Sequence, residues 1–263
     1  MTYRDLLAPM AAAAREAGQL LLTTPRPERA TSFEEFAEAF EAAEAPGAAV
    51  LRRRLEELRP GVEWADELDV LAGPPTVGEV WVVDVLDGAV QFLQGLPQFC
   101  VSLALVRDGE PVAAALHSPL LGETYLAARG DGATRDGRPI APSAKTDPAA
   151  AVVTTGHPPF VARQPEAAAQ AGRSFAAVLP AVAAVRSLGP TTWQIADTAA
   201  GRLDGFWEFG RDAANLLPGA LIAREAGAVV SDTEGNPWTA GSGSFLAAPA
   251  GLHGRLLDAL HGR

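Results

Sequence analysis

The chain has very little of several residue types, and each shortage narrows what it can be. Cys100 is the only cysteine, so no intrachain disulfide can form, and its apolar neighbours indicate a buried side chain rather than a reactive thiolate. Basic residues number 21 against 32 acidic ones, which gives a formal net charge of −11. We therefore expect no nucleic-acid partner, because phosphate backbones are bound by basic surfaces.

Long apolar runs are also missing. No stretch has the length of uncharged apolar sequence that a membrane-spanning helix needs, and the N-terminus lacks the apolar core of a signal peptide. These absences predict no membrane partner and a cytoplasmic location. The 263 residues, 48% of them hydrophobic, are enough for one large domain or two small ones.

The first half of the sequence predicts helices followed by strands. Apolar residues at helical spacing predict helices over 4–22 and 32–58, with a break near Pro46. A short strand is expected in GVEWADE and a buried one in EVWVVDVL, which is rich in β-branched residues. Asp108-Gly109 predicts a hairpin between two further strands, and more Asp-Gly turns predict a meander after it.

The second half alternates strands and helices. Small, polar and proline-containing residues at 141–150 indicate a boundary, which divides the chain into an α+β unit (1–145) and an α/β unit (146–263). Strands are expected in AAVVTTG, VAAVRSLG, DGFWEFG and AVVSDTEG. Helices are expected over 163–179, 191–201 and 215–227.

The acids after the strand EVWVVDVL are the main candidates for chemistry. Asp84 and Asp87, with a backbone carbonyl between them, offer the oxygen ligands that a hard cation such as Mg²⁺ prefers. The amides of Gly88 and Ala89 then open a helix, a place suited to an anionic phosphate oxygen. An isolated D-x-x-D-G is also explained as a turn capped by aspartates, so the spacing alone leaves both interpretations open.

Two long blocks of sequence add context to these acids. WVVDVLDGAVQFLQG resembles the D-P-x-D-G-T-x-N-F signature of the inositol monophosphatase family, and GRLDGFWEFGRDAANLLPGALIAREAG is similar to that family's C-terminal metal-site segment. The resemblance runs from about residue 60 to the end. It implies a layered αβαβα sandwich, an α/β (α+β) fold, and a homodimer. It also implies an Mg²⁺-dependent, lithium-sensitive phosphatase of small phosphorylated polyols, sugars or nucleotides.

Several functional residues carry over from the family directly. Asp84, Asp87 and the Leu86 carbonyl match metal ligands of the signature. Glu67 stands where the family has a glutamate that binds metal and orients the attacking water. Glu208 matches an acid that contacts substrate hydroxyls.

Three positions depart from the family pattern. Ala89 replaces a threonine whose hydroxyl helps activate water, and Glu44 falls where the family has the aspartate that pairs with this threonine. Asn215 replaces an aspartate that binds the second metal. Asp212 precedes Asn215 by one helical turn, so it either supplies the missing charge at the metal and substrate site or caps the helix.

These departures lead to two alternative functions. Because Ala89 has no hydroxyl, general-base activation of the attacking water is impaired, and such activation is worth about 10²–10⁴ in rate. The backbone amides that would bind phosphate are kept. The first hypothesis is thus a phosphomonoesterase with weakened hydrolysis. The alternative is a repurposed homologue that binds a phosphorylated metabolite or performs a non-hydrolytic step.

The four histidines were considered as ligands as well. His117 is expected to be buried and hydrogen-bonded on a strand, and His157 to lie in a loop. His253 and His261 are expected in a terminal helix, solvated.

Overall fold

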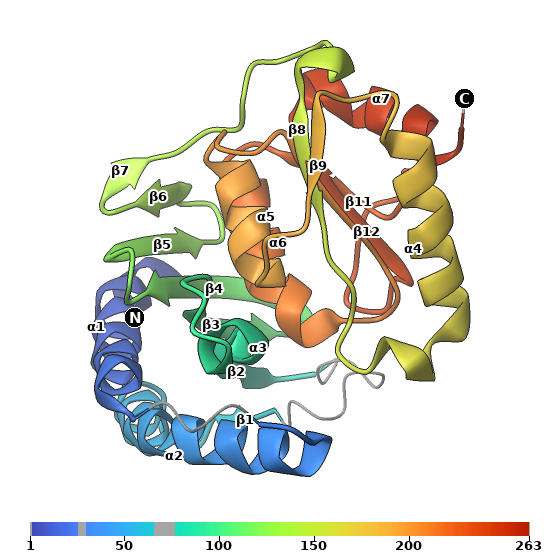
Figure 1. The fold of residues 1–263 in the computed structure, drawn as a ribbon. Helices are drawn as coiled ribbons and strands as arrows, with labels where there is room; N and C mark the ends of the chain where they lie inside the picture. The colour runs from blue at the N-terminus through green and yellow to red at the C-terminus, as the bar shows by residue number, and fades with distance from the viewer. Residues whose placement is uncertain (1, 26–29, 66–76, 263) are drawn as a thin grey trace.

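The computed structural model describes residues 2–25, 30–65 and 77–262, and Figure 1 shows its arrangement in layers. Two sheets lie in the interior, with helices outside each of them and between them (Figure 1). No helix among the described residues is long and apolar enough to cross a membrane.

A seven-stranded sheet is built from the first half of the chain, in the order β1-β2-β3-β4-β5-β6-β7 within the described residues. Only the β1–β2 pair is parallel; the remaining neighbours are antiparallel. The hairpin predicted at Asp108-Gly109 is confirmed. The strands are β1 (Glu63–Trp64), β2 (Glu79–Asp87), β3 (Cys100–Arg107), β4 (Glu110–Ser118), β5 (Glu123–Ala128), β6 (Ala133–Arg135) and β7 (Arg138–Pro139).

A five-stranded sheet is built from the second half, in the order β11-β12-β10-β8-β9. Strands β9, β8 and β10 run parallel, so their carboxyl ends meet at one edge, while β12 is antiparallel to both of its neighbours. The strands are β8 (Val152–Thr155), β9 (Ala184–Arg186), β10 (Gly205–Phe209), β11 (Val229–Ser231) and β12 (Ser244–Ala248).

The helices complete the layers. Helices α1 and α2 pack on the outer face of the first sheet, α5 and α6 lie between the sheets, and α4 and α7 cover the second sheet (Figure 1). This confirms the expected αβαβα sandwich. The helices are α1 (Tyr3–Thr23), α2 (Phe33–Leu58), α3 (Ala89–Leu93), α4 (Pro165–Val178), α5 (Thr191–Ala199), α6 (Ala213–Glu225) and α7 (Ala250–Leu260), with short 3₁₀ turns at Pro148–Ala150 and Val161–Arg163.

Both faces of β2 are therefore covered, which explains its almost unbroken apolar sequence. Seven of its nine residues are buried, and the inner and outer faces belong to different hydrophobic clusters. A strand buried on both sides needs apolar residues at nearly every position instead of in alternation. An acid at its end is thus held in apolar surroundings.

The break expected near Pro46 is wrong: α2 is one continuous helix. The cost of proline inside a helix is offset by tertiary packing, since Ala43, Leu51 and Leu55 on the same helix are buried. Gly47 lets the helix approach β2 closely, because a Cβ there would lie 2.7 Å from Val85 Cγ1. This close approach brings the preceding turn of α2 to the end of β2.

The predicted boundary at 145/146 falls between the two sheets. Strand β7 ends at Pro139 and β8 begins at Val152. Whether 1–145 and 146–263 are separate folding units stays a prediction.

Candidate metal and phosphate site

The end of β2 places Asp84, Leu86 and Asp87 on an irregular segment. Asp84 pairs with Ser102 and Asp87 with Cys100, a shift in register that marks a bulge between the two acids. Bulges change where side chains point and occur beside active sites. The Leu86 backbone N–H donates to Asp84 Oδ1 at 2.9 Å.

Both acids lie near the single cysteine. The Cys100 thiol donates to Asp87 Oδ2 at 3.7 Å. Burial raises the pKa of this thiol, and the negative charges of Asp87 and Asp84 raise it further. The two carboxylates therefore share one neighbourhood, although residues three apart on a regular strand point to opposite faces. Cys100 is buried, as expected.

Gly88 and Ala89 open a short helix immediately after the second acid. Gly88 has φ of +95°, and a Cβ there would lie 2.7 Å from the Gln98 carbonyl oxygen, so only glycine fits. The Phe92 N–H donates to Gly88 O at 2.9 Å and starts α3. The predicted helix opening is confirmed, while its role as a phosphate cradle stays a prediction.

Glu44 reaches this segment from α2. Its carboxylate accepts a hydrogen bond from the Val85 backbone N–H, between the two candidate ligands Asp84 and Leu86. Burial raises the pKa of Glu44, and the nearby Arg52 opposes that shift. Counting back along the sequence therefore located a residue that does lie beside the acids.

The second half of the chain contributes Glu208 on β10 and Asp212 just before α6. Both are almost completely buried, at 0% and 1% exposure. Glu208 Oε2 accepts from Thr191 Oγ1 at 3.2 Å, and Asp212 Oδ1 accepts from Asn215 Nδ2 at 2.7 Å. The other oxygens, Glu208 Oε1 and Asp212 Oδ2, are buried without a donor group, and the two carboxyl groups are within hydrogen-bonding reach of each other once one of them carries a proton.

These unsatisfied oxygens have an electrostatic consequence. Burial raises the pKa of Glu208 well above its usual range, and repulsion from Asp212 adds to the shift. Burial likewise raises the pKa of Asp212 to about 6. Two buried carboxylates so close together are stable only with a shared proton or a cation between them.

The acids of the two halves also act on each other. Burial raises the pKa of Asp87 to about 7, and the charge of Asp212 contributes to that shift. Thr192 lies between them: its hydroxyl is within reach of the Asp87 carboxylate and donates to the Asn215 carbonyl. One hydroxyl has one proton, so it satisfies one of these acceptors at a time.

The two interpretations of Asp212 can now be compared with its surroundings. Asp212 does stand at the N-cap of α6, where its side chain falls short of a capping hydrogen bond although the nearby Asn215 backbone N–H still lowers its pKa. It instead holds the amide of Asn215, the residue that replaces the family's metal-binding aspartate. Its role as a metal or substrate group stays a prediction.

A cation fits these residues chemically, although they do not form a finished metal site. In the part of the chain that the structure describes, no three His, Cys, Asp or Glu side chains gather into a metal-binding group. Glu67 lies outside the described residues. The orphaned Asp212 Oδ2 and the repulsion between Asp87 and Asp212 are what a hard cation with oxygen ligands would relieve.

Sequence reasoning missed three residues of this site: Gly156, Thr191 and Thr192. Gly156 follows β8 and lies against Glu208 Oε2, while the threonines begin α5. The adjacent hydroxyls in PTTW at a helix start were the available signal. Only the tertiary structure shows that Gly156 and Thr191 lie beside Glu208, through the parallel pairing of β8 with β10 and the hydrogen bond from Thr191.

The histidines lie partly as expected. His117 is buried, with Nδ1 at 3.1 Å from Thr124 Oγ1. His157 lies in a loop, and its electrostatic interaction with Asp212 lowers the pKa of that carboxyl. The expected solvation of His261 is confirmed, since the residue is exposed although Nε2 lies 2.9 Å from Thr233 O. For His253 the expectation is wrong: it is half-buried, with Nε2 at 2.8 Å from Ser231 Oγ, because the β11–β12 segment packs along α7.

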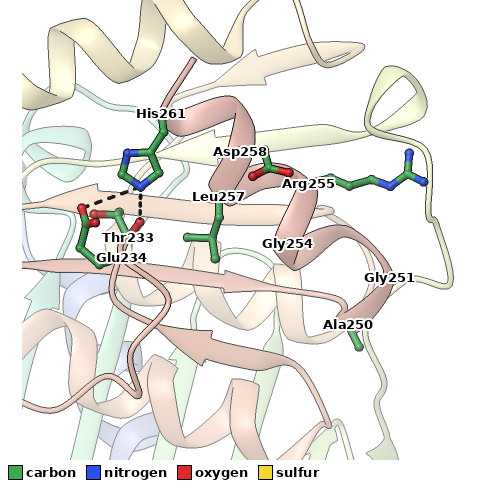
Figure 2. Close-up of a pocket in the computed structure, with 9 residues that line it drawn as sticks. All are labelled: Thr233, Glu234, Ala250, Gly251, Gly254, Arg255, Leu257, Asp258 and His261. Carbon is green, nitrogen blue, oxygen red and sulfur yellow. Dashed lines mark hydrogen bonds and ion pairs between the residues drawn. The ribbon is translucent and has the colours of Figure 1, made fainter. Parts of the chain in front are cut away.

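His261 lines a cavity of about 510 Å³ against α7, which Figure 2 shows. Thr233 and Glu234 lie on one side of it and Arg255 on α7 (Figure 2). None of the predicted site residues lines this cavity, so it is separate from the acids.

Comparisons with known proteins agree with this architecture. Residues 3–262 match the model of the inositol monophosphatase family. An inositol-1-monophosphatase of Mesorhizobium japonicum is 33% identical over 220 residues, covering 80% of this chain and 78% of that protein. A Nus factor SuhB of Pseudomonas aeruginosa is 36% identical over 157 residues, covering 60% of this chain and 58% of that protein. The structure of an inositol monophosphatase from Anabaena (Nostoc) has a TM-score of 0.82 at 26% identity, covering 98% and 96% of the two chains.

Proposed function

The chain belongs to the inositol monophosphatase family, and from this premise we propose that it is an Mg²⁺-dependent phosphomonoesterase with weakened hydrolysis. Its substrate is a small phosphorylated polyol, sugar or nucleotide. We further expect a homodimer in the cytoplasm, with no nucleic-acid or membrane partner.

One observation supports the proposal: buried carboxyl groups from both halves of the chain lie close enough for the charge of one to raise the pKa of another. Asp87 at the end of β2 and Asp212 before α6 have pKa values of about 7 and about 6, raised first by burial. Burying repelling carboxylates lowers stability, so a protein that keeps them has a use for them. Binding a divalent cation is the use that the donor set supports best.

The residues suited to the cation are Asp84, Asp87 and the Leu86 carbonyl, with Asn215 and, by resemblance, Glu67. Bound there, Mg²⁺ would stabilise negative charge on the phosphoryl oxygens. The amides of Gly88 and Ala89 would orient a phosphate oxygen at the start of α3, where N–H groups lack intrahelical partners. Glu208 and Asp212 would contact the rest of the substrate.

Water activation is where this chain is expected to be weak. Ala89 has no hydroxyl, and Glu44 hydrogen-bonds to the Val85 backbone. Asn215 would bind a cation without contributing a negative charge, and it also donates its side-chain amide to Asp212 Oδ1 at 2.7 Å. We expect binding to be retained and the rate to be low.

A phosphate-release screen tests the proposal. Inositol, sugar and nucleotide monophosphates are incubated with the protein, with Mg²⁺ and with a chelator. We expect slow Mg²⁺-dependent release from at least one of them. Release from none of them, or release that the chelator does not affect, rejects the proposal.

A second function is favoured by the joint change at Glu44, Ala89 and Asn215. These positions serve one catalytic task in the family, and their joint change favours a chain that keeps the fold for binding or for a non-hydrolytic step. Calorimetric titration with Mg²⁺ and the same phosphate esters distinguishes the two, since binding without turnover favours this alternative. The triple variant Glu44→Asp, Ala89→Thr and Asn215→Asp should then gain phosphatase activity; if it gains none, other residues limit hydrolysis.

A further inference from the structure

Two phenylalanine side chains that are far apart in the sequence meet at the surface and stay exposed. Phe33 begins α2 and Phe160 lies in the loop after β8, and their ring centroids are 6.3 Å apart with an interplanar angle of 73°. Phe33 is 70% exposed and Phe160 45%. A single apolar side chain on a surface is ordinary, but two rings in contact form a continuous apolar patch of the kind that lines ligand sites.

The loop that carries Phe160 lies beside the acids of the second half. It follows the carboxyl end of β8, which pairs in parallel with β10, and ligands of α/β sheets bind outside such strand ends. His157 in this loop interacts electrostatically with Asp212, and Gln164 Nε2 donates to the Arg211 carbonyl at 3.0 Å. Three residues of chain span at most about 11 Å, so Phe160 lies close to the residue that acts on Asp212.

Phe33 reaches the same loop from the first half of the chain. Figure 1 shows the start of α2 near the loop that joins β8 to α4. The same helix carries Glu44, which contacts Val85 between the candidate metal ligands. Phe33 precedes Glu44 by about 16 Å of helix, which places its ring at the outer rim of the site.

The backbone of Phe160 is held in a conformation that costs energy. Its φ of +51° and ψ of 40° lie in the left-handed region, which bulky residues rarely adopt. Strained residues of this kind cluster at ligand clamps. The Arg163 guanidinium lies over the Phe160 ring, 4.8 Å from its centroid. Phe160 is therefore fixed as a support for Phe33, whose own ring is mostly open to solvent.

We propose that Phe33, supported by Phe160, stacks on the flat aromatic part of the substrate, so that the preferred phosphate ester is a nucleoside monophosphate. This rests on the proposed function and names one substrate class within it. Every nucleobase has a π-face that stacks on an aromatic side chain, and the nearby Arg163 adds a cation that favours such a face. A polyol or simple sugar phosphate has no flat apolar group to cover these rings.

The test compares two probes that differ in the base. Adenosine 5′-monophosphate and ribose 5-phosphate share the ribose and the phosphate, so the Kd of ribose 5-phosphate divided by that of adenosine 5′-monophosphate reports what the base contributes. Calorimetric titration in Mg²⁺ gives both values. We expect a ratio of about ten or more for the wild type, the effect of stacking one base on one ring.

Four variants are compared with the wild type. Phe33→Leu keeps an apolar side chain without the ring, and should lower the ratio to about one. Phe33→Tyr keeps the ring and should keep the ratio. Phe160→Asn removes the support and should lower the ratio, while asparagine accepts the left-handed backbone. Phe175→Leu is the matched control, because Phe175 is a 39% exposed phenylalanine toward the far end of α4.

Several outcomes overturn the proposal. A wild-type ratio near one does so, as does a Phe33→Leu variant that keeps the wild-type ratio or a Phe175→Leu variant that loses as much. If Phe33→Leu lowers Tm and leaves the ratio unchanged, the rings only join the two halves. If it changes the sedimentation of the protein and not the ratio, the patch is a contact between two copies. Binding of neither probe also overturns the proposal, whereas a high ratio without phosphate release rejects the proposed hydrolysis and leaves the stacking site in place.

Discussion

The acids contributed by the two halves of the chain differ in how well their oxygens are satisfied. In the first half, Asp84 accepts the Leu86 N–H and Glu44 accepts the Val85 N–H, and both side chains are half-buried. In the second half, Glu208 and Asp212 are almost fully buried, and each has one oxygen without a donor. Oxygens of the first group accept hydrogen bonds from backbone N–H groups, whereas the free oxygens of the second group need a proton, a cation or a substrate as partner.

This difference assigns different tasks to the two groups. Acids at a strand end whose oxygens already accept backbone N–H groups can bind a cation from solution. Buried acids with free oxygens resist ionisation, and ligand binding relieves their cost. Asp87 belongs to both groups, because it ends β2 but responds to the charge of Asp212.

The largest expected effect comes from removing the first group. The double variant Asp84→Asn and Asp87→Asn should lower Mg²⁺-dependent phosphate release by about 10³-fold, since a bound metal contributes several kcal/mol to catalysis. It should also lose the rise in Tm that Mg²⁺ gives the wild type. Phosphate release and thermal melting with and without Mg²⁺ measure both. An unchanged Mg²⁺-induced rise in Tm would place the cation elsewhere.

A gain of function is the next largest effect. Ala89→Thr returns a hydroxyl to the start of α3, beside the segment that Glu44 contacts, and should raise kcat by about 10²-fold. The matched control is Val90→Thr, which adds a hydroxyl at the next position, where the side chain is 58% exposed. Equal kcat values for the two variants would mean that Ala89 does not limit hydrolysis.

Stability should depend on pH in a direction set by the buried acids. Asp87 and Asp212 have pKa values of about 7 and about 6 in the fold, against 3.8 ordinarily. The folded state therefore binds more protons between these values, so stability falls as pH rises from about 4 to about 7. Without divalent metal, the free energy of unfolding should drop by at least ~1.4 kcal/mol over this range, the equivalent of one pKa unit.

Chemical denaturation in chelator at several pH values measures this slope. Asp87→Asn should flatten it, and Mg²⁺ should reverse it by stabilising the ionised carboxylates. A stability that rises with pH in chelator contradicts the assigned pKa shifts.

The smallest effect separates the two groups directly. Glu208→Gln should raise the metal-free free energy of unfolding near pH 8 by ~1 kcal/mol, because a buried glutamate gains ionisation only on unfolding and glutamine does not. Glu44→Gln, at a half-buried and hydrogen-bonded position, should change it by less than ~0.5 kcal/mol. Denaturant titration of both variants compares them. Equal changes in the free energy of unfolding would mean that the acids of the two halves do not differ in what their burial costs.

Much of this molecule was predictable because its signals are local. Strand β2, the hairpin at Asp108-Gly109 and the start of α3 after Gly88 follow from apolar patterns and turn residues. The continuity of α2 was not predictable, because Pro46 is tolerated through packing against β2. Local propensity gives no information about that packing.

By itself, the sequence determined the family, the layered sandwich and the position of Asp84 and Asp87 at a strand end, since all three are carried by ordered motifs and periodic patterns. Only the tertiary structure decided which of these residues are neighbours. The charge of Asp212 raises the pKa of Asp87, and the Glu44 carboxylate accepts the Val85 backbone N–H. Thr191 hydrogen-bonds to Glu208 beside Gly156, where a Cβ would be too close to both. The physical reason is that burial and pairing across sheets depend on residues far apart in the chain. A carboxylate's pKa and partners follow from those distant neighbours and not from its own motif.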